Sequence, residues 1–273
     1  QAVHGLRVFA PLLVIGNVFF RRTLHYAVIG GWLPAMIEKK RLLAAALKRF
    51  DYIYVETSTM KAALEKQGFT NIVIMPNCKD LKILDGSGLV YPSGEPYKLC
   101  TFSRVMREKG IEDAVNAVKA VNQQFGRIVC TLDVYGQVDA AQTAWFDELQ
   151  KSFPPYIRYG GLIPFEKSVD VVKEHFALLF PTRFFTEGIP GTILDAYAAG
   201  VPVIASKWES FADVVDDGVT GIGISFNDAH ALAEQLASAV EHPQQINEMK
   251  EACLIKARSY LPRIGLSVLI NHI

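Results

Sequence analysis

Residues 184–205 read FFTEGIPGTILDAYAAGVPVIA, and this stretch decides the fold. Pro190 and Gly191 are unsuited to a helix interior, so we expect a helix to begin near Thr192. Gly200 is a typical helix stop, and the apolar run after it suits a strand that is buried on both faces of a parallel sheet. The stretch therefore predicts a loop, a short helix and a buried strand in succession, as in an α/β protein.

The start of this predicted helix is a candidate anion site. The backbone N–H groups of Gly191 and Thr192 would point out of the helix N-terminus, where they can bind phosphate. Glu187 stands just before them, and a carboxylate is poorly placed for binding phosphate alone. It suits a ligand that carries hydroxyl groups beyond its phosphates, as a nucleotide-sugar does.

Strand-like and helix-like segments alternate along the chain, which favours a parallel sheet with helices on both faces. Strands are expected at 24–30, 52–56, 72–75, 97–103, 127–135, 157–159, 177–180, 201–205 and 221–224, with helices at 32–50, at 58–67 and between the later strands. The loop-like residues 76–96 are expected to separate two domains. Ligands of such sheets bind at the carboxyl ends of the strands. Four residues that directly follow strands should gather there: Arg104, Gly136, Gly161 and Glu187.

These motifs resemble those of the group 1 glycosyltransferases, family 4 of the retaining glycosyltransferases. The signature of that family is E-G-x-P-x-x-x-x-E, and here Glu187 and Asp195 occupy the two acidic places. The second acid is shorter by one methylene than in the family. An Arg and a Lys five residues apart, as the family has them, are matched by Arg104 and Lys109.

Further motifs extend the resemblance to about residues 20–260. The sequence DDGVTG at 216–221 is similar to the family's turn before its last strand. AVIGGWLP at 27–34 and YVET at 54–57 resemble a branch of the family that builds polysaccharides.

The resemblance implies a GT-B fold, an α/β architecture of two Rossmann-like domains with parallel sheets, of which the first is incomplete here. Residues 1–90 would be the remainder of the N-terminal acceptor domain and the linker, and 91–258 the nucleotide-sugar-binding domain. Residues 259–273 would form a C-terminal helix that packs back towards the first domain. A chain of this kind begins with a strand and a Gly-rich turn, so the front of the N-terminal domain is expected to be missing. Residues 1–76 should then be poorly stable alone, whereas 95–260 should fold and bind nucleotide.

The resemblance also implies roles for individual residues. Arg104 and Lys109 would clamp the diphosphate and stabilise the leaving nucleoside diphosphate. With Glu187, which would contact hydroxyls of the donor sugar, they are the catalytic candidates. The donor-binding candidates are Gly188, Ile189, Pro190, Gly191, Thr192, Asp195, Gly161 and Leu162. On the acceptor side the candidates are Gly30, Gly31, Trp32 and His25.

Each of these residues also has a structural interpretation. Arg104 and Lys109 could be solvated charges at a helix start, and Glu187 a loop acid favoured by the helix dipole. Asp195 stands three residues after Thr192, so the two could form a capping box instead of Asp195 binding ribose.

The remaining candidates have equally plain alternatives. Residues 160–163 could be an ordinary strand-to-helix turn instead of a backbone that faces the nucleobase. His25 could be a core histidine and Trp32 an aromatic residue at a helix start. Gly86 and Gly88 lack a third Gly and a following helix, so a linker is expected there and not a dinucleotide site.

Composition excludes other classes of function. The 273 residues carry a formal net charge of zero, so no global field favours nucleic acid or an anionic membrane. The cysteines lack metal-like spacing and are expected to be buried thiols in a reducing cytosol: Cys78, Cys100, Cys130 and Cys253. No metal site is expected. The apolar residues 3–20 are short for a membrane span and are expected to form a buried or interfacial helix.

The resemblance thus implies transfer of a sugar, with retention, from a nucleotide-sugar to a hydroxyl acceptor without a cofactor or divalent metal. The acceptor would be a saccharide or lipid-linked saccharide in cell-envelope or capsular polysaccharide synthesis. The expected location is the cytoplasm, with peripheral association at the inner face of the membrane as a further option and no nucleic-acid partner. Two alternatives stay open: a nucleotide-sugar epimerase of the same fold, and a non-catalytic partner subunit that binds nucleotide-sugar.

Overall fold

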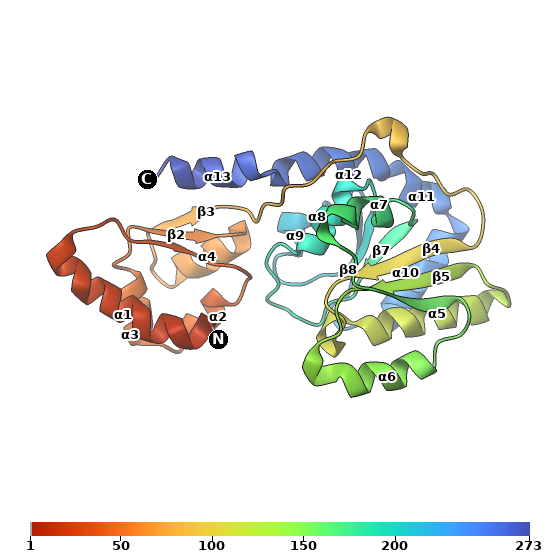
Figure 1. Cartoon of the computed structure of the whole chain (residues 1–273), viewed down its shortest axis with the longest axis horizontal. Coiled ribbons are helices and arrows are strands. Elements are labelled where there is room, and N and C mark those ends of the chain that lie inside the picture. The colour runs from red at the N-terminus through yellow and green to blue at the C-terminus, as the bar shows by residue number, and fades with distance from the viewer. Residues whose placement is uncertain (1) are drawn as a thin grey trace. The chain divides into compact units, whose positions relative to one another are not determined.

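The computed structural model describes residues 2–273 and contains two parallel sheets, each in a compact unit of its own. The first unit holds the chain up to Asn77 together with Thr186–Ile189 and Arg263–Ile273. The second unit holds Cys78–Phe185 and Pro190–Pro262. Figure 1 shows both sheets, the first in orange and the second in yellow to blue.

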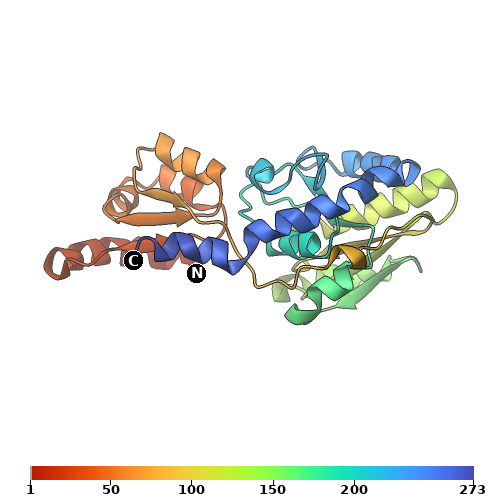
Figure 2. The same cartoon turned by 90° about the horizontal axis from the view of Figure 1, so that it is seen from above.

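The sheet of the first unit has the order β1-β2-β3, and all of its strands are parallel. They are β1 (His25–Ala27), β2 (Tyr52–Val55) and β3 (Ile72–Ile74), with helices α1 (Ala2–Phe20), α2 (Leu33–Glu38), α3 (Arg41–Leu47) and α4 (Ser58–Lys66). In Figure 2 the red α1 and the orange α4 lie on opposite sides of this sheet. Thr57 begins α4, since its hydroxyl accepts the Met60 N–H.

The helix expected at 32–50 is two helices, α2 and α3. The backbone leaves the helical region at Lys40, which has φ −129° and ψ 70°. Leu33 and Ile37 are buried, and in one continuous helix the same face would next present Lys40 and Arg41. The break turns these cations away from the core and lets Leu43 and Leu47 be buried instead.

The helix expected at 3–20 is α1, and its outer face is not buried. Ala10 is buried, and Leu6 and Val14 pack against the core of the first unit. Large apolar side chains are exposed on the rest of the helix: Val8, Phe9, Leu12, Leu13, Ile15, Val18, Phe19 and Phe20. Within the described part of the chain, no helix has the length and apolar character needed to cross a membrane.

The sheet of the second unit is parallel throughout, with the order β6-β5-β4-β7-β8-β9. Its strands are β4 (Tyr97–Phe102), β5 (Cys130–Tyr135), β6 (Ile157–Gly161), β7 (Ala177–Phe180), β8 (Val203–Ser206) and β9 (Gly221–Ile224). Its helices are α5 (Ile111–Phe125), α6 (Thr143–Lys151), α7 (Ser168–Val172), α8 (Gly191–Ala198), α9 (Phe211–Val214), α10 (Ala229–Glu241), α11 (Pro243–Glu248) and α12 (Lys250–Ala257). In Figure 1, α5 and α10 lie together on one side of this sheet, and α7, α8 and α12 on the other. The last helix, α13 (Pro262–Ile270), leads back into the first unit, where the His272 ring lies 4.5 Å from that of Tyr52.

Of residues 76–96, expected to be a loop-like linker, those from Cys78 onward belong to the second unit. The Lys79 N–H donates to the Tyr260 carbonyl, and the Leu84 N–H to the Ala198 carbonyl. Leu89 lies so close to Gly200 that a Cβ on that glycine would overlap it. The change of unit therefore falls between Asn77 and Cys78, before the domain boundary expected at 90/91.

A buried polar network joins the middle of β5 to the segment before β7. The Asp133 carboxylate pairs with Arg158 and lies 3.1 Å from the His175 ring nitrogen. Although burial opposes it, contact with Cys100 and Asp133 raises the pKa of His175 to about 10. Cys100, which is fully buried, is thus part of a structural network and is out of reach of a substrate. Cys130 and Cys253 are also buried, as expected, whereas Cys78 is half-buried.

Lys250, at the start of α12, is a buried cation. It is 1% exposed. Burial lowers its pKa from 10.5 to about 8. Because the folded state disfavours the charged form, this amine destabilises the fold at neutral pH.

Lys250→Met should therefore raise the free energy of unfolding at pH 7, by about 1–3 kcal/mol. The gain should shrink as the pH rises above about 8, since the folded amine loses its proton there. It should vanish above pH 10.5, where the amine is neutral in both the folded and unfolded states. Urea denaturation at several pH values measures this, with exposed Lys98→Met as the control. A loss of stability at pH 7 would show that the amine has a favourable partner.

Candidate active site

The carboxyl ends of the strands in the second unit form a tightly built edge. Gly136, after β5, has φ 131°, and a Cβ there would overlap the Ser103 carbonyl oxygen after β4. Gly110 has φ 69°, and its Cβ would overlap the Pro181 carbonyl oxygen after β7. The Gly136 N–H donates to the Gly161 carbonyl at 2.9 Å. Only glycine allows these loops to lie backbone against backbone.

Both candidate cations lie at this edge. Arg104 directly follows the loop residue Ser103, and its side chain is 64% exposed, with Asp139 at 3.8 Å as a distant partner. The Lys109 amine lies over two aromatic rings, 5.1 Å from the centre of Phe184 and 5.6 Å from that of Phe180. The exposed guanidinium of Arg104 can therefore reach a ligand, and Lys109 is held in a defined position by the rings.

The N-terminus of α8 opens onto free space at the same edge. Pro190 precedes the helix and provides no side-chain cap. A Cβ at Gly191 would meet no atom within 4 Å, so the space beside this first helical residue is open. The Thr192 hydroxyl donates to the Phe102 carbonyl and thereby ties α8 to the end of β4. This arrangement suits a phosphate group, which unpaired N–H groups at a helix start bind well.

Asp195 does not form a capping box with Thr192. Thr192 lies inside α8, not at its N-cap, and Asp195 is 2% exposed in the middle of the helix. Both carboxylate oxygens lie 2.6 Å from the Lys79 amine, and one also accepts the Ser168 hydroxyl at 2.7 Å. The Lys79 amine in turn lies 4.5 Å from the centre of the Phe165 ring. The buried Asp195 carboxylate is thus fully hydrogen-bonded by the Lys79 amine and the Ser168 hydroxyl. It does not need the free backbone N–H that a capping box would provide.

In the Lys79–Asp195 ion pair, Lys79 is the residue that reaches solvent. The Lys79 side chain is 20% exposed and that of Asp195 only 3%. Contact of Asp195 with a ribose, which the signature implies, stays a prediction. A ligand hydroxyl would have to share carboxylate oxygens that already accept three hydrogen bonds.

Glu187 lies in the segment that belongs to the first unit. The Gly31 N–H donates to the Thr186 carbonyl at 3.1 Å, and a Cβ at Gly31 would come within 2.7 Å of that oxygen. The Ile189 N–H donates to the buried carboxylate of Glu56 at 2.8 Å. The segment that carries the signature acid and the Gly30–Gly31 loop are thus brought together in one unit. Gly188, next to Glu187, packs against Gly30, since a Cβ on Gly188 would come within 2.9 Å of the Gly30 Cα.

The other acceptor-side candidates have internal partners. The Trp32 indole donates to the Ile29 carbonyl at 2.7 Å. His25 is half-buried, lies 2.9 Å from the Tyr54 hydroxyl and stacks on Tyr52 at 5.3 Å. These contacts favour a structural role for His25, and its role towards an acceptor stays a prediction.

The last donor-side candidates lie at the end of β6. Gly161 has φ 75° with open space around it, and Leu162 is 68% exposed. A nucleobase contact by this turn stays a prediction.

Sequence analysis missed Lys79 and Ser168, which contact Asp195, and Phe165, whose ring lies beside the Lys79 amine. The available signal was Asp195 itself, because an acid on the buried face of an apolar helix requires a cation nearby. It also missed a role for Glu56, although an acid that directly follows a buried strand stands where ligands bind.

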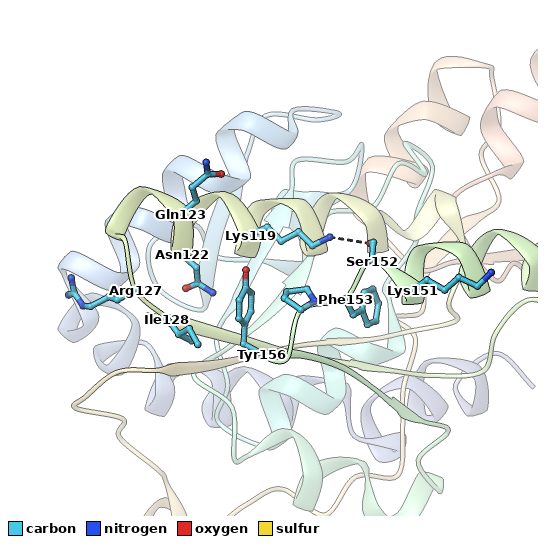
Figure 3. Close-up of a pocket in the computed structure, with 10 residues that line it drawn as sticks. Lys119, Asn122, Gln123, Arg127, Ile128, Lys151, Ser152, Phe153 and Tyr156 are labelled. Atoms are coloured by element: carbon cyan, nitrogen blue, oxygen red, sulfur yellow. Dashed lines mark hydrogen bonds between the residues drawn. The ribbon is translucent and has the colours of Figure 1, made fainter.

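A pocket of about 510 Å³ lies away from this edge, beside the amino ends of β5 and β6 (Figure 3). Its cations have internal partners: Lys119 donates to Ser152, Arg127 pairs with Glu95, and Lys151 with Glu148. It is therefore not part of the candidate active site.

Comparison with known families identifies the family of this chain. The model of the family described as "Glycosyl transferases group 1" matches residues 96–242, more than half of the chain. The chain belongs to the group 1 glycosyltransferases.

Two of the similar curated proteins are named for polysaccharide biosynthesis in bacteria. The amylovoran biosynthesis glycosyltransferase AmsK of Erwinia amylovora is 27% identical over 64% of this chain and 42% of its own length. The putative colanic acid biosynthesis glycosyltransferase WcaL of Salmonella typhimurium is 24% identical over 55% of this chain and 38% of its own. The chain thus spans about two fifths of the length of the curated relatives it matches.

Solved structures show the same GT-B fold. Anabaena HepE in complex with UDP-glucose has a TM-score of 0.77 at 15% identity, covering 96% of this chain and 75% of that one. Sucrose-phosphate synthase from Thermosynechococcus elongatus has a TM-score of 0.74 at 16% identity, covering 100% of this chain and 78% of that one. The expected α/β fold with two parallel sheets is confirmed.

Lys79→Met should lower the free energy of unfolding by about 3 kcal/mol, because it leaves the Asp195 carboxylate buried without its cation. Lys79→Met combined with Asp195→Leu should cost less than the sum of the two single changes, by about 1 kcal/mol or more. Urea denaturation of the four proteins measures this coupling. The control is Lys82→Met, since Lys82 is exposed. Additive losses would mean that the pair does not act as a unit.

Proposed function

We propose that this chain catalyses transfer of a sugar from a nucleoside-diphosphate sugar to a hydroxyl acceptor, with retention at the anomeric carbon. The observation that carries the proposal is the family match over residues 96–242, the part of the chain that builds the edge with Arg104 and Lys109. A turnover assay with several nucleotide-sugars and a saccharide acceptor tests it directly. Absence of nucleotide binding would contradict it.

The donor is proposed to be a uridine diphosphate sugar. Two structural neighbours are described as complexes of HepE with UDP and glucose and with UDP-glucose. In this chain the diphosphate would lie between Arg104, Lys109 and the open N-terminus of α8, where charge and backbone donors coincide. The turn at Gly161 would face the base, and Glu187 the sugar hydroxyls.

The proposed chemistry follows from where charge develops. The bond between the anomeric carbon and the diphosphate oxygen breaks, and a new bond forms to the acceptor oxygen on the same face. The acceptor proton passes to the leaving phosphate oxygen. Arg104 and Lys109 would stabilise the negative charge that collects on the diphosphate. These two cations would supply the charge stabilisation that a divalent metal can provide elsewhere.

The proposed acceptor is a growing saccharide, free or lipid-linked, in cell-envelope or capsular polysaccharide synthesis. The names of the two relatives, which refer to amylovoran and colanic acid biosynthesis, support this choice. We place the reaction in the cytoplasm at the inner face of the membrane. Sedimentation with vesicles of anionic lipid would test the membrane part of this proposal separately.

A second candidate is a partner subunit that binds nucleotide-sugar without turning it over. The observation that favours it is Asp195, whose carboxylate is paired with Lys79 and withdrawn from solvent. Nucleotide affinity without transfer to any acceptor would support this alternative, and turnover would exclude it.

Arg104→Ala and Lys109→Ala should each weaken UDP binding about tenfold to a hundredfold, because each removes a charge-assisted contact to phosphate. Calorimetric titration with UDP measures this, and Lys119→Ala in the pocket of Figure 3 is the matched control. If both variants bind UDP as the unchanged protein does, the diphosphate does not lie at this edge.

A further inference from the structure

The segment Thr186–Ile189, which carries the signature acid Glu187, is part of the first unit and is held there by hydrogen bonds at both of its ends. The Thr186 carbonyl accepts the Gly31 N–H. The Ile189 N–H donates to Glu56, and the Ile189 carbonyl accepts the side-chain amide of Asn77 at 3.0 Å. Three hydrogen bonds therefore fix a segment of four residues from both of its ends.

Glu56 is the central partner in this arrangement. It follows β2 directly, is 6% exposed, and accepts backbone N–H groups from both Ile189 and Gly30. One carboxylate therefore joins the Gly30–Gly31 loop to the segment that carries Glu187. Because it is buried and acts as a double acceptor, a neutral side chain of another shape cannot replace it without leaving N–H groups unpaired.

Gly188 shows how closely the carboxylate and the segment fit. A Cβ at residue 188 would overlap the Glu56 Oε2 and come within 2.9 Å of the Gly30 Cα. Glu56 is therefore in direct contact with the backbone on the C-terminal side of Glu187.

We propose that Glu56 is a positioning residue: it holds the backbone on the C-terminal side of Glu187 and the Gly30–Gly31 loop that holds the other side, so that this acid is presented to the donor sugar in one orientation. This inference rests on the proposed function for its catalytic consequence. The structural part, that Glu56 holds the segment, does not depend on it.

The pKa of Glu56 is raised, as is common for buried acids in functional sites. Burial raises the pKa of Glu56, the N–H groups of Ile189 and Gly30 oppose this, and the nearby Glu187 adds to it. The raised pKa means that the folded state disfavours the ionised carboxylate relative to the neutral acid, although the two N–H groups partly offset this cost.

Amide hydrogen exchange in the whole chain is the first test. In Glu56→Ala the Ile189 amide should exchange about tenfold to a hundredfold faster, because it loses a bond to a charged acceptor. Gly188→Ala, whose Cβ displaces the carboxylate, should have the same effect. Glu56→Gln keeps one carbonyl acceptor and should lie between. Unchanged exchange at Ile189 in Glu56→Ala and Gly188→Ala would overturn the proposal.

Kinetics with a UDP-sugar are the second test. Glu56→Ala should lower kcat at least about tenfold while UDP affinity stays within about twofold, and Glu56→Gln should recover part of the rate. Glu65→Ala on α4 is the matched control, because its side chain is half-exposed and pairs only loosely with Lys61 at 3.8 Å. An unchanged kcat in Glu56→Ala would overturn the positioning role.

The two tests separate the failure of this inference from that of the proposed function. If the unchanged protein turns over no nucleotide-sugar, the proposed function fails, and the exchange result still decides whether Glu56 holds the segment. If transfer proceeds, and neither the exchange of the Ile189 amide nor kcat changes in Glu56→Ala, only the inference fails.

Discussion

The close approach of backbones at the carboxyl edge of the second sheet is the constraint on which the candidate site depends. The loops after β4, β5 and β7 meet at Gly110 and Gly136, where no side chain could be accommodated. This approach places the exposed Arg104 and the ring-covered Lys109 beside the same strand ends. A parallel sheet aligns the carboxyl ends of its strands by itself, but side chains would keep the loops apart. The two glycines remove that spacing and make one compact edge.

The ion pair between Lys79 and Asp195 connects this edge to the rest of the second unit. It brings together the segment after β3, the helix α8 and, through Ser168, the helix α7. A buried pair of this kind adds little stability in itself, but losing either member is costly. It therefore fixes which segments must lie together more than it adds to the total stability.

Much of the fold could be predicted from local patterns. Strands buried on both faces are seen as continuous apolar runs, and helix ends as glycines. β5, β7, β8 and β9 lie within or at the expected positions. The break at Lys40 did not follow, since helix propensity is high throughout residues 35–47 and only burial decides where the cations turn outward. In the candidate site, Arg104 and Lys109 were predicted from the resemblance to the family and Gly191 from the expected helix start, and the structure places all three at the ends of the strands. Lys79 and Glu56 were not, because their partners Asp195 and Ile189 lie more than a hundred residues away.

The division of the chain between its two units limits how one unit can be exchanged for that of a related protein. The chain passes from one unit to the other after Asn77, Phe185, Ile189 and Pro262, so neither unit is a continuous stretch of sequence. A recombination event that exchanged the second unit as one block, from Cys78 to Pro262, would also transfer Thr186–Ile189. The incoming segment would have to fit a Gly-Gly loop and a buried acid that stayed behind in the first unit. Selection would therefore act on these two parts together, and the four transferred residues would covary with Gly31 and Glu56 more than with their own neighbours along the chain.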